Sequence, residues 1–468
     1  MNEEEEIMLF SSIPFLHYFL PAVIIAYFAV PRKGKNAVLL LSSLVFYGWG
    51  EPKLLLLMVF TIFLFWGCGL AIGASAQQTV KKFWLLVSVV ISVALLGLFK
   101  YADFFIGTFN SLTGLGVPML RLALPVGISF YTFQSLSYTV DVWRGNVPSQ
   151  KNLISFGAYV SMFPQLIAGP IVRYSDIARQ LESRTHSRED FFLGLRRFLV
   201  GLGKKVILAD NFALLMKLFR ESDEKSVLFY WLYALAFLFN IYFDFSGYSD
   251  MAIGLGRIFG FRFPENFNYP YLSKSVTEFW RRWHMTLGSW FRDYVYIPLG
   301  GNRVSKSRWV FNILVVWMLT GLWHGAAWNF VAWGLFFGIM LMIEKWVPGL
   351  QKLPDLLRHV YVLIAVMFSF VLFNADSFAM ALGDFAGLLG LSNVPAVTPA
   401  SVYYLKSYGV LFCVGILGST PVVKRAGERI LESKWAAVLE PLFLGAMLLV
   451  CTAYLVDGSF SPFLYFRF

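Results

Sequence analysis

The sequence predicts an all-α polytopic membrane protein. Of its 468 residues, 58% are hydrophobic and only 14% are charged, whereas a soluble protein of this length carries about a quarter charged residues. Apolar runs close to the length that spans a bilayer recur from one end of the chain to the other. We therefore expect a single integral membrane domain over residues 1–468 and not a string of soluble domains.

The charge and the cysteines fit the same class. Lys and Arg accumulate in cytoplasmic loops and contact anionic lipid heads, which explains the net charge of +11. We expect the lipid bilayer as a partner and no nucleic acid. Cys68, Cys413 and Cys451 are too few and too scattered for a disulfide framework or a zinc site, so we expect them to serve packing.

Residues 1–100 are expected to form the N-terminal spans. The first span covers about 13–30, two more lie on either side of "GWGEPK", and another covers about 83–99. The basic stretches "PRKGK" and "QQTVKK" follow the first and third spans, which places both in the cytoplasm and the acidic N-terminus outside. The opening "MNEEEEIMLFSS" lacks the basic start and cleavage site of a secretory signal, so we expect the first span to be retained.

The pattern becomes irregular in residues 101–350, where we expect the functional core. Two apolar stretches are interrupted by Pro125, Gly127, Pro164 and Gly169. Backbone groups freed at membrane depth must be satisfied by protein or by water in a cavity. We expect broken or re-entrant helices around a cavity, although kinked structural helices would have the same sequence.

Two basic segments lie in this region. Residues 173–206 contain eight Lys and Arg, and residues 274–308 contain seven. Both fit interfacial helices that face lipid, but for the second segment we favour a function because His284 and Asp293 lie among the cations.

The remaining spans bring the expected total to about ten or eleven. They cover about 227–247, 309–323, 327–347, 357–373, 406–420 and 436–456, and residues 351–468 form the C-terminal spans. No internal repeat is evident, which argues against a transporter built from two related halves.

Familiar nucleotide-binding and nucleophile motifs fail. "GLGRIFG" has Phe259 where a dinucleotide fingerprint needs its third glycine. "GLGKK" lacks the earlier glycine and the Ser or Thr of a phosphate loop. The sequence has no G-x-S-x-G elbow, and its five histidines show no metal-ligand spacing. We therefore expect no metal.

Two histidines remain as candidate catalytic residues. His324 stands in "TGLWHGAAWNF" between two apolar runs, and His284 lies in "EFWRRWHMTLGSWF". An ionisable group at membrane depth is costly and usually faces a cavity, although a histidine bonded to a backbone carbonyl would be purely structural. Because an imidazole titrates near neutrality, His324 can take a proton from an acceptor alcohol while a thioester supplies the acyl group.

Several neighbours are candidates for binding the substrate or the acyl donor. They are Arg281, Arg282, Trp283, Arg292, Trp323, Trp328, Asn329 and Asp244. The arginines and their neighbouring tryptophans suit a phosphorylated, adenine-bearing donor, an acidic carrier protein or lipid head groups. Trp323, Trp328 and Trp333 either wall a cavity or form an interfacial belt, and Gly321 and Gly325 permit close helix approach or a helix break. Asp244 has a structural alternative, hydrogen bonding within a bent helix.

The histidine-bearing stretches resemble the membrane-bound O-acyltransferase family, in its bacterial branch that contains alginate O-acetyltransferase and the teichoic acid D-alanyltransferase. "EFWRRWHMTLGSWFRDYVYIPLGGNR" and "LWHGAAWNFVAWG" are similar to the two histidine motifs of that branch. "FDFSGYSDMAIG" and "FPQLIAGPIVR" also match its pattern, and the similarity runs through essentially the whole chain.

The resemblance implies helices around a central tunnel, with His324 as the catalytic residue and His284 orienting substrate or assisting. It implies a multi-pass enzyme of the bacterial cytoplasmic membrane that moves an acyl group from a cytoplasmic thioester to a hydroxyl of an extracytoplasmic polysaccharide. Acetyl-CoA is the expected donor, no cofactor stays bound, and extracytoplasmic companion proteins complete the transfer. Transfer of D-alanine from an acylated carrier protein stays open. Two further alternatives also stay open. One is a non-enzymatic transporter or channel in which His324 acts as a gating or proton-relay group, and the other is a glycan-synthesis scaffold.

Overall fold

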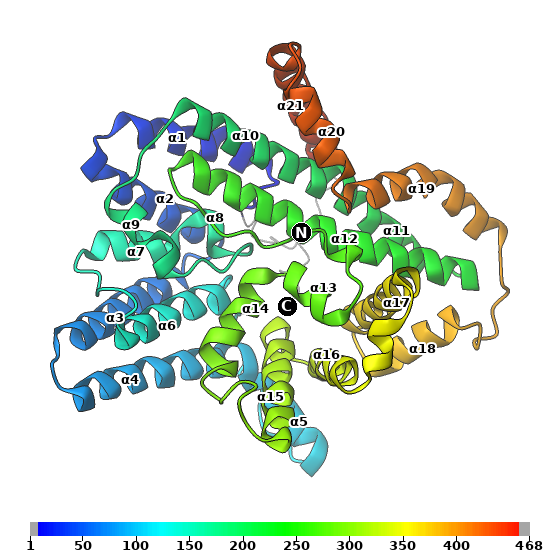
Figure 1. Ribbon diagram of the computed structural model, residues 1–468, viewed down its shortest axis with the longest axis horizontal. Coiled ribbons are helices and arrows are strands. Elements are labelled where there is room, and N and C mark those ends of the chain that lie inside the picture. Colours follow the sequence, from blue (N-terminus) through cyan, green and yellow to red (C-terminus); the bar gives the residue numbers. More distant parts are fainter. Residues whose placement is uncertain (1–7, 458–468) are drawn as a thin grey trace. The chain divides into compact units, whose positions relative to one another are not determined.

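The structure is a computed structural model that describes residues 8–457. Every regular element in these residues is a helix (Figure 1), which confirms the predicted fold class. The acidic stretch "MNEEEEI", expected on the outer side of the membrane, lies outside the described residues.

Contacts divide the chain into two compact units. Unit 1 comprises Met1–Phe198 and Tyr248–Pro264, and unit 2 comprises Leu199–Gly247 and Glu265–Phe468. The long helix α12 (Val227–Ile258) contributes its first part to unit 2 and its last part to unit 1.

Unit 1 contains the N-terminal helices. They are η1 (Phe15–Phe19), α1 (Leu20–Ala29), η2 (Arg32–Gly34), α2 (Lys35–Gly50), α3 (Leu55–Ala74), α4 (Gln78–Leu96), η3 (Gly97–Tyr101), α5 (Ala102–Thr113), α6 (Ile128–Arg144), α7 (Leu153–Ser161), α8 (Phe163–Leu166), α9 (Tyr174–Glu182) and most of α10 (Arg188–Gly203).

Unit 2 contains the segments that carry both candidate histidines. Its elements besides α12 are η4 (Lys204–Ala209), α11 (Asp210–Glu221), η5 (Pro270–Leu272), α13 (Val276–Arg282), α14 (Met285–Phe291), η6 (Arg292–Tyr296), α15 (Lys306–His324), α16 (Trp328–Trp346), η7 (Pro348–Lys352), α17 (Asp355–Asn374), α18 (Phe378–Leu388), α19 (Pro399–Gly418), α20 (Val422–Leu431) and α21 (Ala436–Val456).

Six helices among the described residues are long and apolar enough to cross a membrane. They are Leu55–Ala74, Gln78–Thr113, Val227–Ile258, Asp355–Asn374, Pro399–Gly418 and Ala436–Val456. Phe15–Ala29, expected as the first span, is apolar but shorter. The two spans expected around His324 are α15 and α16, which are helical as predicted but do not belong to these six.

The interrupted segments of unit 1 differ from each other. The stretch after Leu153 is broken, because α7 ends at Ser161 and α8 starts at Phe163 with Pro164 in its first turn. The preceding stretch is a single helix, α6, and its interruption falls before it, at Gly127 with a φ of +71°. The expected helix break is therefore present in the second stretch, whereas the first is continuous from Ile128 to Arg144.

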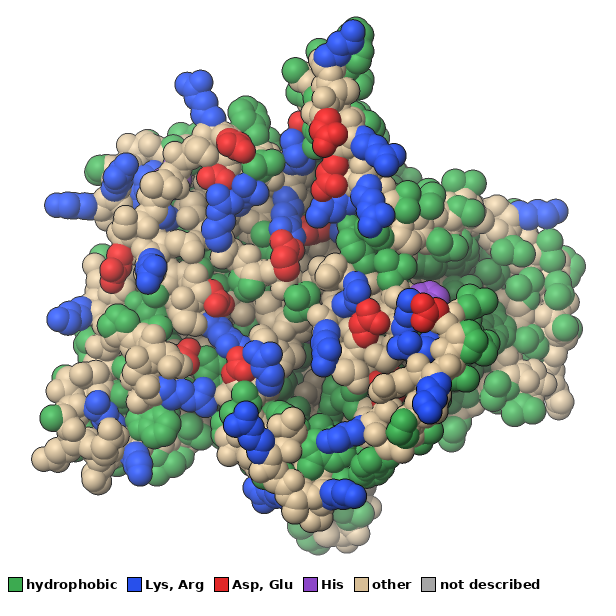
Figure 2. Space-filling model, viewed as in Figure 1, with side chains coloured by type: hydrophobic (Ala, Val, Ile, Leu, Met, Phe, Trp, Pro, Cys, Tyr) green, Lys and Arg blue, Asp and Glu red, His purple; other side chains and the backbone are tan. Residues whose placement is uncertain are grey.

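An aromatic core fills unit 2. The part of α12 before Gly247 presents large side chains to it, and α17 and α13 add others; they include Phe237, Tyr242, Phe243, Phe279, Trp283 and Phe370. By contrast, Cys451 is the one buried residue of α21. An apolar helix that is exposed over its length is typical of a lipid-facing span. Figure 2 shows hydrophobic side chains interspersed with Lys and Arg over the drawn face.

Candidate active site

A tightly packed helical hairpin positions His324. The helix α15 ends at His324, and a three-residue turn leads into α16, which packs antiparallel against α15 as far as the contact between Trp309 and Trp346. A Cβ added to Gly321 would lie 2.2 Å from the carbonyl oxygen of Phe330, and one added to Gly334 would lie 2.1 Å from that of Trp317. The close approach predicted for Gly321 is thus present, and it holds the end of α15 against α16.

Aromatic rings surround the imidazole of His324, which is 5% exposed. Trp333, one and a half turns into α16, lies 4.9 Å from it between ring centroids, and Phe373 near the end of α17 lies 5.4 Å away. The ring of Trp323 lies 5.0 Å from it. All three rings meet the imidazole edge to face, at 80–84°. Such a wall excludes bulk water and strengthens electrostatic interactions inside the site.

His284 occupies the break between α13 and α14. Its backbone is left-handed, with a φ of +42°, so the helix cannot continue through it. The imidazole is buried and meets the ring of Phe245 edge to face at 4.7 Å. The ring of Trp323 lies 5.7 Å from it and 5.0 Å from His324. The structure therefore brings both predicted histidines to one indole ring.

The electrostatics of His284 follow from this burial. Burial lowers the pKa of His284 well below its usual value, and the neighbouring His324 lowers it further. His284 is consequently a neutral imidazole at neutral pH.

The tryptophans and Asn329 have different surroundings. Trp323 and Trp333 are buried beside His324, whereas the side chain of Trp328, at the start of α16, is 52% exposed. Asn329 is buried and its Nδ2 donates a hydrogen bond to the carbonyl oxygen of Ala375 at 2.9 Å. Asn329 thus ties the start of α16 to the end of α17.

The three candidate arginines, Arg281, Arg282 and Arg292, lie outside the aromatic wall. Arg281 and Arg292 are exposed, and the guanidinium of Arg292 pairs with Asp293 at 2.7 Å. Arg282 pairs with Glu278, four residues earlier on α13, at 2.9 Å. Two of the three cations are therefore partly neutralised by acidic side chains of the same segment.

Trp283 belongs to the packed interior of unit 2. It is buried and stacks at 5.6 Å with Phe279, and its other neighbours include Phe267 and Phe370. Its place is in the aromatic core that supports His284, one residue further along the chain.

Asp244 takes part in a buried ionic cluster. Its Oδ1 lies 2.8 Å from Nζ of Lys205, which also lies 2.7 Å from Oδ1 of Asp210. Burial acts to lower the pKa of Lys205, but the two carboxylates raise it above its usual value, so the lysine remains charged. The cluster joins α12 to the π-helical turn η4 and to α11.

Two polar residues that were not predicted from the sequence, Asn266 and Glu344, contact the segment that carries His284. Oδ1 of Asn266 lies 3.0 Å from Nδ1 of His284. The carboxylate of Glu344, buried on α16, accepts hydrogen bonds from the backbone N–H groups of Val276 and Thr277 at the start of α13. Their sequence signal is weak: each is a lone polar residue in an aromatic or apolar run.

Two further histidines form hydrogen bonds with residues far away in the sequence. Nε2 of His186, in unit 1, lies 2.9 Å from the hydroxyl of Tyr27, and Nδ1 of His359, in unit 2, lies 3.2 Å from the carbonyl oxygen of Ser273. Within residues 8–457, no group of three or more His, Cys, Asp or Glu side chains is placed to hold a metal ion.

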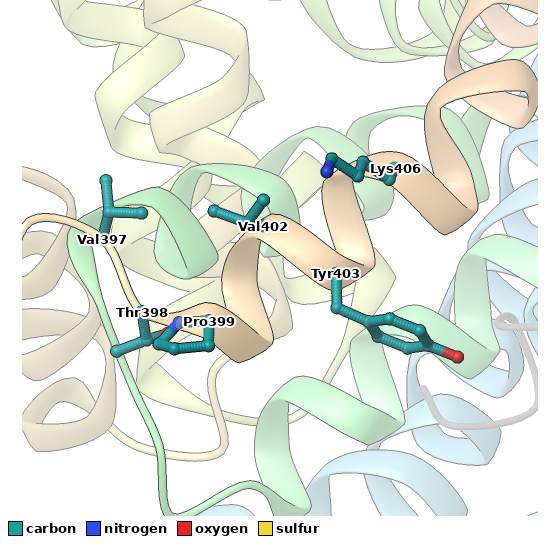
Figure 3. Close-up of a pocket in the computed structure, with 6 residues that line it drawn as sticks. All are labelled: Val397, Thr398, Pro399, Val402, Tyr403 and Lys406. Carbon is teal, nitrogen blue, oxygen red and sulfur yellow. The ribbon is translucent and has the colours of Figure 1, made fainter.

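A surface pocket lies elsewhere in unit 2. It has a volume of about 560 Å³ and is formed at the start of α19 (Figure 3) by Val397, Thr398, Pro399, Val402, Tyr403 and Lys406. Its lining contains none of the candidate site residues.

Comparison with known proteins gives a consistent result. The profile of the membrane-bound O-acyltransferase family matches residues 43–382. The probable alginate O-acetylase AlgI of Azotobacter vinelandii is 43% identical over 82% of this chain and 79% of its own length. The protein of the same name in Pseudomonas putida is 38% identical over 98% of this chain and its whole length. The peptidoglycan O-acetyltransferase of Helicobacter pylori is 34% identical over 83% of this chain and 81% of its own length.

Proposed function

The chain belongs to the membrane-bound O-acyltransferase family and is an O-acyltransferase, and from that premise we propose that it acylates a hydroxyl of an extracytoplasmic polysaccharide, with His324 as the general base. The main support for this proposal is that two buried imidazoles, those of His284 and His324, both lie next to the ring of Trp323. Aromatic rings on α16 and α17 surround His324.

The reaction needs one proton acceptor and no covalent acyl-enzyme. His324 removes the proton of the acceptor hydroxyl as its oxygen attacks the carbonyl carbon of the thioester. The carbon–sulfur bond then breaks, and the thiolate takes the proton back from the imidazolium. An ester and a free thiol result, and His324 returns to its neutral form. General base catalysis of this kind contributes about 10²- to 10⁴-fold to the rate.

The buried neutral imidazole of His284 serves as the second polar group of the site. Because burial and His324 hold the pKa of His284 low, His284 accepts or donates a hydrogen bond without competing for the proton. Its place beside Trp323 supports a role in orienting the acceptor hydroxyl.

Acetyl-CoA is the proposed donor. The relatives are named as O-acetylases or O-acetyltransferases, which favours an acetyl group over D-alanine from a carrier protein. Arg281 and Arg292 are exposed and are the proposed contacts for the phosphate groups of the donor, and Trp328 for its adenine. For Asp244, the ion pair with Lys205 favours a role in holding α12 and not in contacting the donor.

The acceptor and the companions follow from the same relatives. Their names state alginate and peptidoglycan, so we infer an envelope or secreted glycan as acceptor and the cytoplasmic membrane of a bacterium as the location. Extracytoplasmic companion proteins then receive or deliver the acyl group.

Turnover by purified protein tests this function. The protein in detergent, with radiolabelled acetyl-CoA, alginate or peptidoglycan fragments and the companion proteins, is expected to release free CoA and form an alkali-labile acetyl ester without any membrane gradient. His324→Ala is expected to lose this activity. His359→Gln is its matched control, because His359 forms a hydrogen bond with a backbone carbonyl oxygen away from the aromatic wall. A protein that carries acetyl groups across liposomes but never cleaves the thioester in detergent would be a transporter and would refute the proposal.

A further inference from the structure

One amide oxygen receives hydrogen bonds from two neighbouring side chains at the break between α13 and α14. Oδ1 of Asn266 accepts from Oγ1 of Thr286 at 2.8 Å and from the backbone N–H of Thr286 at 3.4 Å. Nδ1 of His284 lies 3.0 Å from the same oxygen. All three side chains are buried.

This arrangement determines which nitrogen of His284 carries the proton. The backbone N–H of Thr286 can only donate, so its contact identifies the facing atom of Asn266 as the oxygen and not the amide nitrogen, and the hydroxyl of Thr286 then donates to the same oxygen. Because an amide oxygen only accepts, Nδ1 of His284 must be the donor. A neutral imidazole with its hydrogen on Nδ1 has its lone pair on Nε2.

The backbone around His284 is held by the same loop. The N–H of Met285 donates to the carbonyl oxygen of Asn266, and the N–H of Asn268 donates to that of Arg282, both at 2.9 Å. These two bonds bracket His284 and stabilise its left-handed backbone, a conformation that is unfavourable for a non-glycine residue. The loop thus fixes both the ring and the chain that carries it.

We propose that Asn266 is a positioning residue that locks His284 as the Nδ1–H tautomer and so makes Nε2 a hydrogen-bond acceptor for a second hydroxyl of the acceptor sugar, next to the one that attacks. His284 then aligns the attacking hydroxyl, whose proton passes to His324. The proposal rests on the proposed acyl transfer, but the tautomer itself is a property of the resting protein.

The tautomer is measured directly by ¹⁵N NMR of protein labelled in its five histidines, with the His284 signals assigned by their loss in His284→Gln. The wild type is expected to show a protonated Nδ1 and an unprotonated Nε2. A protonated Nε2 in the wild type would overturn the proposal without reference to any variant or to activity.

Substitutions separate positioning from simple structural support. Asn266→Leu removes the acceptor, so the Nδ1–H preference is expected to disappear and kcat to fall roughly ten- to a hundredfold, as when a partner that orients a functional histidine is lost. Asn266→Asp keeps an acceptor oxygen and is expected to retain the tautomer and recover part of kcat. Equal tautomers in the wild type and Asn266→Leu, or no recovery in Asn266→Asp, would contradict the proposal.

Asn312→Leu is the matched control. Asn312 is equally buried and its Nδ2 donates to the carbonyl oxygens of Leu299 and Gly301, so its loss is expected to lower stability without changing the His284 tautomer. If acyl transfer is absent in the wild type while the Nδ1–H tautomer is present, the proposed function fails and the assignment of Asn266 stands.

Discussion

The indole ring of Trp333 lies 4.9 Å from the imidazole of His324 and at 81° to it. Trp333 reaches this position because Gly321 and Gly334 let α15 and α16 approach until backbone meets backbone. The orientation of the candidate base therefore depends on the packing of one hairpin.

Replacing Trp333 by Phe keeps an aromatic ring but puts a smaller one beside the imidazole of His324. We expect kcat to fall about tenfold or more, because a displacement of about 1 Å at a catalytic group can cost on the order of 10²-fold. Trp346→Phe, in the exposed last turn of the same helix, is the control. The kcat values of both variants are measured by steady-state kinetics in detergent. Equal values would show that Trp333 does not position His324.

Gly321→Ala is expected to separate the hairpin. The added Cβ would lie 2.2 Å from the carbonyl oxygen of Phe330, so the helices must move, at a cost of about 1–3 kcal/mol. Gly383→Ala in α18, where a Cβ would meet no atom within 4 Å, is the matched control. Melting temperatures in detergent should fall only for Gly321→Ala, and an unchanged value there would contradict the close packing.

Lys205→Met should destabilise unit 2 strongly. It removes the cation that the buried carboxylates of Asp210 and Asp244 share, and loss of one partner from a buried ion pair costs about 3–5 kcal/mol. Lys217→Met is the control, because Lys217 and Glu221 form an exposed pair that contributes under about 1 kcal/mol. The comparison uses thermal unfolding of both variants, and similar melting temperatures would mean that the buried cluster carries no stability.

The stability of the protein should depend on pH through His284. Its pKa is lowered in the folded state, whereas an unfolded histidine titrates near about 6.5. The unfolded chain therefore binds the proton first as the pH falls, and stability is lost below about pH 6.5.

A difference measurement isolates this contribution. His324 is the titratable group that acts on His284, and the other neighbours, Phe245, Trp323 and Asn266, are uncharged. The melting temperature of the wild type minus that of His284→Gln should become smaller as the pH falls from about 7 to about 5. A difference that becomes larger as the pH falls would show that His284 is protonated in the folded protein.

Much of the fold was predictable because its signals are local. Apolar runs of spanning length and the glycines beside His324 depend on neighbouring residues, and the hairpin of α15 and α16 follows from them. The resemblance of the two histidine-bearing stretches was equally local, and the family match over residues 43–382 confirms it.

The contacts around His284 were not predictable in the same way. Asn266 precedes it by 18 residues, and the two meet only because the loop folds back over the break between α13 and α14. No periodicity encodes such a closure. Trp328 illustrates the same limit, since the sequence left open whether its side chain walls a cavity or lies at an interface, and the structure shows it exposed.

The proposed role of His324 is that of the base in acyl transfer to an envelope glycan. The most direct measurement is mass spectrometry of envelope and secreted glycans from a deletion strain without paralogues, complemented with the wild type, His324→Ala or His359→Gln. We predict acetylated glycan with the wild type and His359→Gln, and none with His324→Ala, although all three proteins reach the membrane in equal amounts. Full acetylation with His324→Ala would contradict the claim.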